Sequence, residues 1–536
     1  MSRLFQYVAL LWFSTMVLQA KAQLSPALLR GLLQDSSFVA NAGMQDAQLV
    51  QQFYGQTDYK IAWLNNAGLK HRQVLLRDLQ IAGDLGLETS HYRLQTLASF
   101  ATGSPMKNML DSATNELLLT DAALHFYGDV RYGSQLPSFN FDGVKYKPDR
   151  TPMIVLLAAS FAKDDLTHFL AAAEPADVMY VGLKQWLRYF NPLTRHLDFS
   201  EVTISAKNSD VSNKALVQKL MQLRILDSAH AVNFEGSLAP KIKEAQALLG
   251  LQPDGVLGPS TLRAMNVPIQ QRIEAIKVAL NYMRWMGSMQ HRNPHIVVNL
   301  PSASLQLYQN GEPVFDSKII AGKPNTPTPT LSSTITEVIL YPYWTVPQSI
   351  ATKELLPKIK RNTSYLEQNN FQVLNRQGKL LDPHSINWQS LSASNFPYTI
   401  RQSTGCDNSL GLVKLNFANP FSVYLHDTPA KTLFNTYRRF YSHGCVRVAK
   451  AAELAAMVAK EHRFQIDSVL KAGCLHQQEP IVIAASQPMN VYIIYSTVWF
   501  DVNGRITFYD DVYNKLKAPA SSLNTAVFNA NAGAVR

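Results

Sequence analysis

The chain has 536 residues, of which 46% are apolar and 17% charged, so it is long enough for several folded domains and too apolar to be disordered. Its 50 Lys and Arg outnumber 39 Asp and Glu, which gives a net charge of +11. The basic residues are scattered, however, and form no nucleic-acid-binding run or motif, so we expect no nucleic-acid partner. Three cysteines are too few for a fold built on disulfides.

The first 22 residues have the pattern of a secretory signal. Arg3 precedes an apolar run from Phe5 to Leu18, and Ala20 and Ala22 supply an A-x-A cleavage pattern. We therefore expect residues 1–22 to be a signal peptide and the mature protein to be exported. Retention of this segment as an uncleaved membrane anchor is the alternative.

Residues 23–211 are predicted to form a helical scaffold domain. Segments 46–54, 72–85 and 112–130 have apolar residues spaced three and four apart, the period of an amphipathic helix. Glycine, proline and asparagine separate these segments. We find no cluster of His, Cys and carboxylate residues with metal-ligand spacing in this region, so its expected role is structural.

Residues 212–268 are predicted to form a small helical unit, followed by a linker helix within residues 269–293. Helical patterns cover 213–226 and 240–249, a Pro-Asp-Gly turn follows at 253–255, and another helix begins at 258–261. The run from Ile242 to Asn266, with its Asp-Gly-Val-x-Gly-x-x-Thr stretch, resembles the three-helix peptidoglycan-binding module. The resemblance implies a wall-binding unit. The alternative is that these residues only shape turns and core.

After His295 the hydrophobic period changes from helical to strand-like. Residues 294–473 are predicted to form a β-rich catalytic domain, and residues 474–536 to add further strands and a tail. Residues 351–398 interrupt the domain with a basic helix from Lys353 to Arg361, polar loops and a hairpin at 375–378. Because long connections usually carry function, we predict that this insertion is a mobile lid. Expected strands are 296–300, 303–308, 313–320, 334–343, 398–401, 422–425, 491–495 and 506–509.

The segment with the strongest chemical signal pairs two histidines with one cysteine. His426 lies in the segment Tyr-Leu-His-Asp, and fifteen residues separate it from the segment Ser-His443-Gly-Cys445-Val-Arg-Val. A cysteine nucleophile needs a base to take its proton and a cation or helix N-terminus to stabilise its thiolate. His426 could be the base, and we expect a helix at 450–460 to begin about one turn after Cys445. Backbone amides at the Gly-containing turn could stabilise an oxyanion.

This His-x15-Ser-His-Gly-Cys spacing resembles the signature of the L,D-transpeptidases, cysteine enzymes that cross-link peptidoglycan. Further matching segments resemble the large Gram-negative members, whose architecture is a scaffold domain, a peptidoglycan-binding module and a catalytic domain with a lid. The resemblance thus implies a multidomain α+β fold, a periplasmic location and no cofactor. The matching segments are Asn299, 342–347, 401–402, Gly405, Asn408, 410–411, 424–429, 497–499 and 508–510.

The resemblance also implies roles for individual residues. Cys445 would be the nucleophile and His426 its base, oriented by the backbone carbonyl of Asp427. The oxyanion site would be lined by His443, Gly444 and the Cys445 amide, with Ser442 as support. Candidates for substrate binding are Arg447, Arg401, Asn408, Tyr424 and Trp344. Packing for His443, ion pairing for Arg447 and Arg401, and a core role for Tyr424 and Trp344 are the alternatives.

The implied reaction is 3→3 cross-linking: Cys445 attacks a tetrapeptide stem, releases D-Ala, and passes the acyl group to an amine on a second stem. Carbapenem-type compounds would be inhibitors, and other wall-synthesis proteins are candidate partners. An L,D-carboxypeptidase, a lipoprotein-anchoring transferase and a non-catalytic wall-binding scaffold remain alternatives. A zinc site of His426, His443 and Cys445 is a further alternative, but no motif supports it. Cys406 puts a second thiol near the site, or pairs with Cys474.

Overall fold

The computed structural model describes residues 24–65, 67–101, 108–195, 202–205, 214–227, 237–289, 294–476, 478–501 and 503–516. The expected signal peptide lies outside these residues. The chain divides into two compact units. The first contains residues up to 136, 147–193 and 280–288, and the second contains 137–146, 194–279 and 289 onward. The first is helical and the second combines helices with sheets, which confirms the multidomain α+β class.

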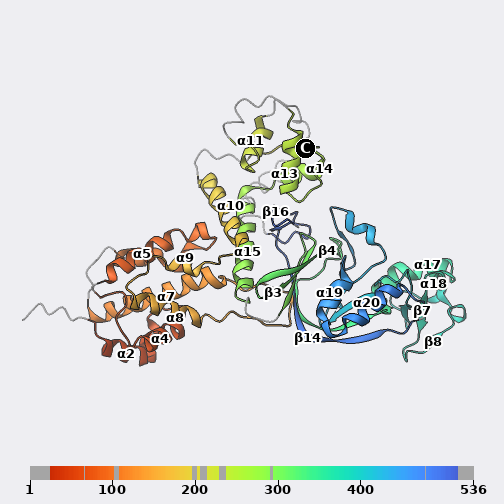
Figure 1. The fold of residues 1–536 in the computed structure, drawn as a ribbon, viewed down its shortest axis with the longest axis horizontal. Coiled ribbons are helices and arrows are strands. Elements are labelled where there is room, and N and C mark those ends of the chain that lie inside the picture. The colour runs from red at the N-terminus through yellow and green to blue at the C-terminus, as the bar shows by residue number, and fades with distance from the viewer. Residues whose placement is uncertain are drawn as a thin grey trace, which may run out of the picture. The chain divides into compact units, whose positions relative to one another are not determined.

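The first unit is a helical bundle around the long helix α7, Met109–Tyr132 (Figure 1). Nearly every turn of α7 is buried, and Leu117, Phe126 and Tyr127 are fully inaccessible. The predicted helices at 46–54, 72–85 and 112–130 are all present, although the second is split at Ile81. The helices of this unit are α2 Pro26–Gln34, α3 Ser36–Asn41, α4 Ala47–Gln56, α5 Gly68–Gln80, α6 Leu94–Ala101, α8 Thr151–Ala162, α9 Phe169–Ala173 and α10 Val178–Arg195, with the short turns η1 Ala82–Leu85 and η2 Thr89–Tyr92.

The small helical unit contains α11 Lys214–Gln222, α13 Ala239–Leu248 and α14 Pro259–Met265, and α15 Ile269–Gly287 follows. Its Asp-Gly stretch is organised by Gln246, a buried side chain on α13. The Gln246 amide donates to Asp254 Oδ1 at 2.7 Å and to Thr261 Oγ1 at 3.0 Å, and its oxygen accepts from Gly255 N–H at 2.8 Å. The motif residues therefore hold the turn between two helices.

The β-rich region that begins near residue 294 is a mixed sheet that closes on itself. Its order is β5-β10-β11-β13-β4-β3-β2-β14, and β14 pairs with β5 as well as with β2, which completes the ring. β1, Phe141–Asp142, is added to β5, and β12, Phe440–Ser442, is added to β4. The ring strands are β2 His295–Asn299, β3 Ser304–Gln309, β4 Glu312–Gly322, β5 Leu331–Leu340, β10 Val413–Phe417, β11 Leu425–His426, β13 Val446–Val448 and β14 Ile481–Ile494.

One helix packs against the apolar side chains of the ring strands. α19, Ala451–Val458, buries Ala451, Leu454, Ala455 and Val458 against the apolar side chains of the strands. α20, Arg463–Ala472, follows after the short turn η8, Lys460–His462, and adds Ile466 and Val469 to the same core. The apolar faces of the strands and of α19 are thus used for packing, and the polar side chains of the strands lie on the other face.

The insertion forms a subdomain with its own sheet and core (Figure 1). Its sheet order is β6-β9-β7-β8, and Trp388, Phe371 and Ile400 are among its core residues. The 398–401 strand belongs to this sheet, so the insertion extends beyond the predicted 351–398 bounds. Its elements are β6 Trp344–Thr345, α16 Gln348–Ile350, the π-helical turn η4 Ala351–Leu355, α17 Leu356–Arg361, α18 Tyr365–Gln368, β7 Phe371–Leu374, β8 Leu380–Leu381, η5 Pro383–Ser385, η6 Trp388–Ser390 and β9 Thr399–Gln402.

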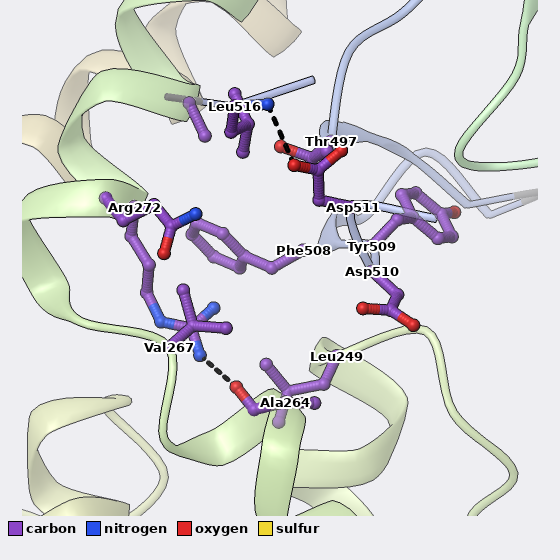
Figure 2. Close-up of a pocket in the computed structure, with 12 residues that line it drawn as sticks. Leu249, Ala264, Val267, Arg272, Thr497, Phe508, Tyr509, Asp510, Asp511 and Leu516 are labelled. Carbon is purple, nitrogen blue, oxygen red and sulfur yellow. Dashed lines mark hydrogen bonds between the residues drawn. The ribbon is translucent and has the colours of Figure 1, made fainter. Parts of the chain in front are cut away.

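After β14 the chain forms a two-stranded hairpin of β15, Val498–Phe500, and β16, Ile506–Phe508. This hairpin packs beside α14 and α15 around a cavity of about 40 Å³ (Figure 2). Figure 2 shows Phe508 beside Arg272, whose guanidinium carbon lies 5.2 Å from the ring centroid and whose Nη2 donates to Ala264 O. The cavity is too small for a peptide, and its lining includes neither Cys445 nor His426.

Among the described residues, no helix has both the length and the apolarity needed to cross a bilayer.

Candidate active site

Strand register places the predicted catalytic residues together on one face of the sheet. Lys414 on β10 lies directly opposite His426 on β11, and His426 lies opposite Arg447 on β13. Since side chains alternate between faces, Tyr424 shares the face of His426 and Cys445 shares the face of Arg447. The Tyr424 carbonyl accepts from Val446 N–H at 3.1 Å, so the chain segments that carry Tyr424 and Cys445 are adjacent.

Cys445 is a free, partly buried thiol whose Sγ donates to Ser422 O at 3.6 Å. Tyr424 hydrogen-bonds the same sulfur through its backbone N–H and its phenol. Burial raises the pKa of the Cys445 thiol, although these hydrogen bonds and the charges of Lys414 and Arg447 oppose the increase. The resting cysteine is therefore a protonated thiol that needs a base.

His426 is 4% exposed, and its Nδ1 lies 2.6 Å from Asp427 O. A carbonyl oxygen can only accept, so Nδ1 carries the proton and Nε2 carries the lone pair. Burial lowers the pKa of His426 to about 3, and the positive charge of Arg447 contributes to the decrease. The imidazole is therefore neutral at physiological pH, the state that a general base requires.

The turn before Cys445 is held by side-chain hydroxyls. Ser442 Oγ donates to Cys445 O at 2.6 Å and accepts from Gly444 N–H at 3.1 Å, and Thr328 Oγ1 donates to Gly444 O at 2.8 Å. Gly444 has φ +122°, in the left-handed region that favours glycine. The Gly444 N–H already donates to Ser442 Oγ, so it is not available to another acceptor. The Cys445 amide has no hydrogen-bond acceptor among the described residues, so it is the backbone donor available for an oxyanion.

His443 points toward the insertion. Its Nε2 lies 2.8 Å from Glu354 Oε1 on η4, and the two side chains are 35% and 47% exposed. The His443 ring thus makes a polar contact between the catalytic turn and the insertion.

The expected helix N-terminus beside Cys445 is not adjacent to the thiol. β13 occupies residues 446–448, and α19 begins only at Ala451, so a whole strand separates the thiol from the helix. The predicted helix is therefore present as α19, but of the two sources of stabilisation considered, the structure supports a cation, because the effect of a helix terminus decays within about one turn. The cations that act on Cys445 are Lys414 and Arg447.

The other candidate residues fall into two groups. Tyr424 lies in the site, with its ring centroid 5.6 Å from that of His426, and Trp344 hydrogen-bonds the Tyr424 side chain from the insertion. The guanidinium of Arg447 is largely buried, and its Nε has no hydrogen-bond partner in the described part of the chain. These three residues face the thiol or its neighbours.

Arg401, Asn408 and Asp427 contact other parts of the structure. Arg401 donates to Gln372 Oε1 and stacks over Tyr343 at 4.2 Å, within and beside the insertion sheet. Asn408 is buried and donates to Pro342 O and Ser403 O. The Asp427 carboxylate accepts from Leu412 N–H and pairs with Lys431. Within this structure each of these side chains holds a loop.

Cys406 and Cys474 form a disulfide between the 403–411 loop and the end of α20. Cys406 is therefore not a second free thiol near the site. Among the described residues, no group of three or more His, Cys, Asp or Glu side chains could hold a metal ion.

Three site residues were missed in the sequence. Lys414 belongs to β10, which was not predicted, although its Val-Lys-Leu-Asn-Phe alternation is a strand signal that puts Lys414 on the polar face. Glu354 and Ser422 reach the motif only through tertiary contacts, for which the sequence carries no local signal.

The geometry defines a multidomain α+β protein with a neutral thiol and a neutral imidazole on one face of a closed sheet. Residues 293–482 match a family model described as "L,D-transpeptidase catalytic domain". Residues 48–187 match "Scaffold domain", and residues 212–265 match "Putative peptidoglycan binding domain". The chain therefore contains a region similar to the L,D-transpeptidase catalytic domain, preceded by regions similar to a scaffold domain and a peptidoglycan-binding domain.

One curated protein and two solved structures are similar to parts of this chain. A curated Haemophilus influenzae protein described as "Putative L,D-transpeptidase" is 36% identical over 245 residues, which cover 44% of this chain and 47% of the relative. The chain therefore spans about half the length of the curated relative it matches. Among solved structures, an L,D-transpeptidase from Mycobacterium smegmatis matches with a TM-score of 0.18 and 11% identity over 37% of this chain and 58% of that chain. The Ldtfm-avibactam carbamoyl enzyme matches with a TM-score of 0.18 and 12% identity over 41% and 61%.

Proposed function

We propose that this protein is an L,D-transpeptidase that forms 3→3 peptidoglycan cross-links through a Cys445 thioester. The observation that carries the proposal is the placement of the free Cys445 thiol on the same face of neighbouring strands as His426, a neutral base whose Nδ1 is held by a backbone carbonyl. Two cations, Lys414 and Arg447, lie on the same face of the sheet, which suits a reaction that generates a thiolate.

The first half-reaction releases D-Ala from the donor tetrapeptide. His426 Nε2 takes the thiol proton, and the sulfur of Cys445 bonds to the carbonyl carbon of the third stem residue. The Cys445 amide donates to the oxyanion that forms on the carbonyl oxygen. When the C–N bond breaks, the proton on His426 passes to the amine of the leaving D-Ala. The product is a thioester.

The second half-reaction transfers the acyl group to the side-chain amine of a second stem. That amine attacks the thioester carbon and gives a proton to His426 Nε2. The C–S bond then breaks, and the proton returns to the sulfur of Cys445. If water attacks instead of the amine, the same residues give the L,D-carboxypeptidase reaction, and an amine on a lipoprotein gives the anchoring reaction. A non-catalytic scaffold is the alternative from a different class.

The insertion supplies a basis for preferring the amine. Its Glu354 contacts His443 in the turn beside the nucleophile, and its Trp344 reaches Tyr424. A folded cover at this position would exclude water from the thioester, which is the role of an active-site lid. The proposal that the insertion is a lid therefore rests on these two contacts and not on the polar composition of the insertion's loops.

The location and partners follow from the same proposal. We propose that residues 1–22 direct the protein to the periplasm, and the disulfide between Cys406 and Cys474 supports an oxidising compartment. Peptidoglycan stems would be donor and acceptor, the small helical unit would bind wall, and carbapenem-type compounds would acylate Cys445. Other wall-synthesis proteins would be partners.

The test is mass spectrometry of wall fragments after incubation with the protein and with Cys445→Ala. We expect stem dimers and free D-Ala from the natural sequence and neither from the variant. The variant should fold, because Sγ makes only weak hydrogen bonds and point changes of this kind stay within about 0.5–3 kcal/mol. Tripeptides without dimers would favour the carboxypeptidase. Full activity in the variant would remove Cys445 from the mechanism.

A further inference from the structure

Lys414 is a charged side chain in the site that the thiol–imidazole reaction described above does not require. On β10 the buried residues Val413, Leu415 and Phe417 alternate with Lys414 and Asn416. Lys414 therefore lies on the face away from the core, and its register partner on β11 is His426. The strand pairing alone brings an ammonium group to the catalytic face of the sheet.

The contacts of Lys414 lead to the sulfur of Cys445. Its Nζ lies 4.3 Å from the centroid of the Tyr424 ring, and the Tyr424 phenol hydrogen-bonds the thiol. The strongest charge interaction of the Lys414 side chain is with Cys445, and the next strongest is with Glu337. Burial lowers the pKa of Lys414, so the ammonium is partly desolvated and its field is less screened than that of a surface lysine.

Lys414 and Arg447 act chiefly on different partners. The positive charge of Lys414 lowers the pKa of Cys445 more than that of Arg447 does. On His426 the order is reversed, since Arg447 has the larger effect. The titratable and charged groups on this face are thus Lys414, Tyr424, His426 and Arg447, and the pair of His443 with Glu354 lies at the turn that precedes Cys445. Of these, Lys414 is the cation that favours negative charge on sulfur most strongly.

We propose that Lys414 is the counter-cation of the Cys445 thiolate. When the S–H bond breaks and His426 takes the proton, the negative charge that remains on sulfur is stabilised by the ammonium held over the Tyr424 ring. The ammonium keeps its own protons throughout. The charge on sulfur disappears when the thioester forms and returns when the thioester breaks, so Lys414 acts in both half-reactions. This assignment deepens the proposed function and rests on it.

The test is the pH dependence of Cys445 alkylation by iodoacetamide in the full chain. Cys445 is the only cysteine outside the disulfide, so alkylation reports on this thiol alone. In Lys414→Met we expect the midpoint of the rate profile to move to higher pH, and the rate below the midpoint to fall on the order of tenfold, because a nearby opposite charge changes a pKa by about one unit or more. Lys414→Arg should restore the profile.

Glu337→Gln is the matched control, because Glu337 is the second charged partner of Lys414. If Lys414 only maintained an ion pair, Glu337→Gln and Lys414→Met would change the alkylation profile equally, and the proposal would be overturned. We expect Glu337→Gln, and Lys379→Met on the exposed turn of the insertion, to leave the midpoint in place. If Lys414→Met does not fold, Lys414→Gln takes its place in the comparison.

The result separates this proposal from the proposed function. Alkylation does not depend on a wall substrate, so a shifted midpoint supports the role of Lys414 even if Cys445→Ala retains wall activity. Conversely, an unchanged midpoint in Lys414→Met refutes the counter-cation while wall chemistry by Cys445 stands.

Discussion

The contact between Glu354 and His443 predicts how the insertion controls the fate of the thioester. Glu354→Gln keeps the shape of the side chain and removes the charge that pairs with His443 at 2.8 Å. The substitution leaves Cys445, His426 and Lys414 untouched. We expect the thioester to form normally and to be hydrolysed more often, because the insertion is held less tightly against the catalytic turn.

The exposure of the pair limits the size of the effect. His443 and Glu354 are 35% and 47% exposed, so water screens their attraction, and such pairs contribute about 0.2–1 kcal/mol. Since about 1.4 kcal/mol corresponds to a tenfold change in an equilibrium, loss of the pair should weaken closure by at most about fivefold. The ratio of hydrolysed to cross-linked product should therefore rise by up to about fivefold, not by orders of magnitude.

Mass spectrometry of stem products measures this ratio directly. Glu367→Gln is the control, because Glu367 also pairs with a histidine on the insertion, His384 at 3.3 Å, but has no contact with the motif. We expect no change in that variant, and His443→Gln combined with Glu354→Gln should add little to the single variants. An unchanged product ratio in Glu354→Gln would refute the view that this contact holds the lid.

Three further predictions concern titration, the disulfide and metals. Because burial raises the pKa of Cys445, the rate of Cys445 alkylation should keep rising with pH above neutrality, and a plateau below pH 7 would contradict this. The pKa of His426 is lowered to about 3 in the folded protein, compared with about 6.5 in the unfolded chain, so the free energy of unfolding should be highest above pH 6.5 and should fall as the pH decreases toward 3. Thermal unfolding at several pH values measures this decrease. Opening the Cys406–Cys474 disulfide, with a sequence separation of 68, should destabilise the fold by about 4 kcal/mol, and an unchanged unfolding midpoint after reduction would disprove that contribution. Metal chelators should leave activity unchanged, since no cluster of metal ligands occurs among the described residues; loss that zinc restores would revive the metal hypothesis.

Local sequence patterns were sufficient for much of the fold. The helices α4, α7, α13 and α15 follow from apolar periodicity. The motif around Cys445 and His426 pointed to the thiol–imidazole pair, because its residue types and spacing are local features.

What the sequence did not reveal depends on non-local pairing. β9 has the same alternation as a ring strand, so its membership in the insertion sheet could not be told from residues 399–402 alone. Lys414 becomes informative only once β10 is placed next to β11. The helix expected at 450–460 is present as α19, but β13, which lies between it and Cys445, was not predicted because three residues are too few to show a period.

The closure of the ring also constrains when the catalytic domain can fold. β2 pairs in parallel with β14, so residues 295–299 cannot complete their pairing until residues 490–494 are available. Likewise, β1 at residues 141–142 pairs only with β5 at residues 331–332. Such distant pairings are slow to form, because a long loop must be ordered before the contact stabilises it. A chain emerging from its N-terminus therefore remains without a complete ring until the last ring strand has appeared. For a protein that we propose is exported, this late completion means that the catalytic domain cannot be fully folded before residues 490–494 have been made.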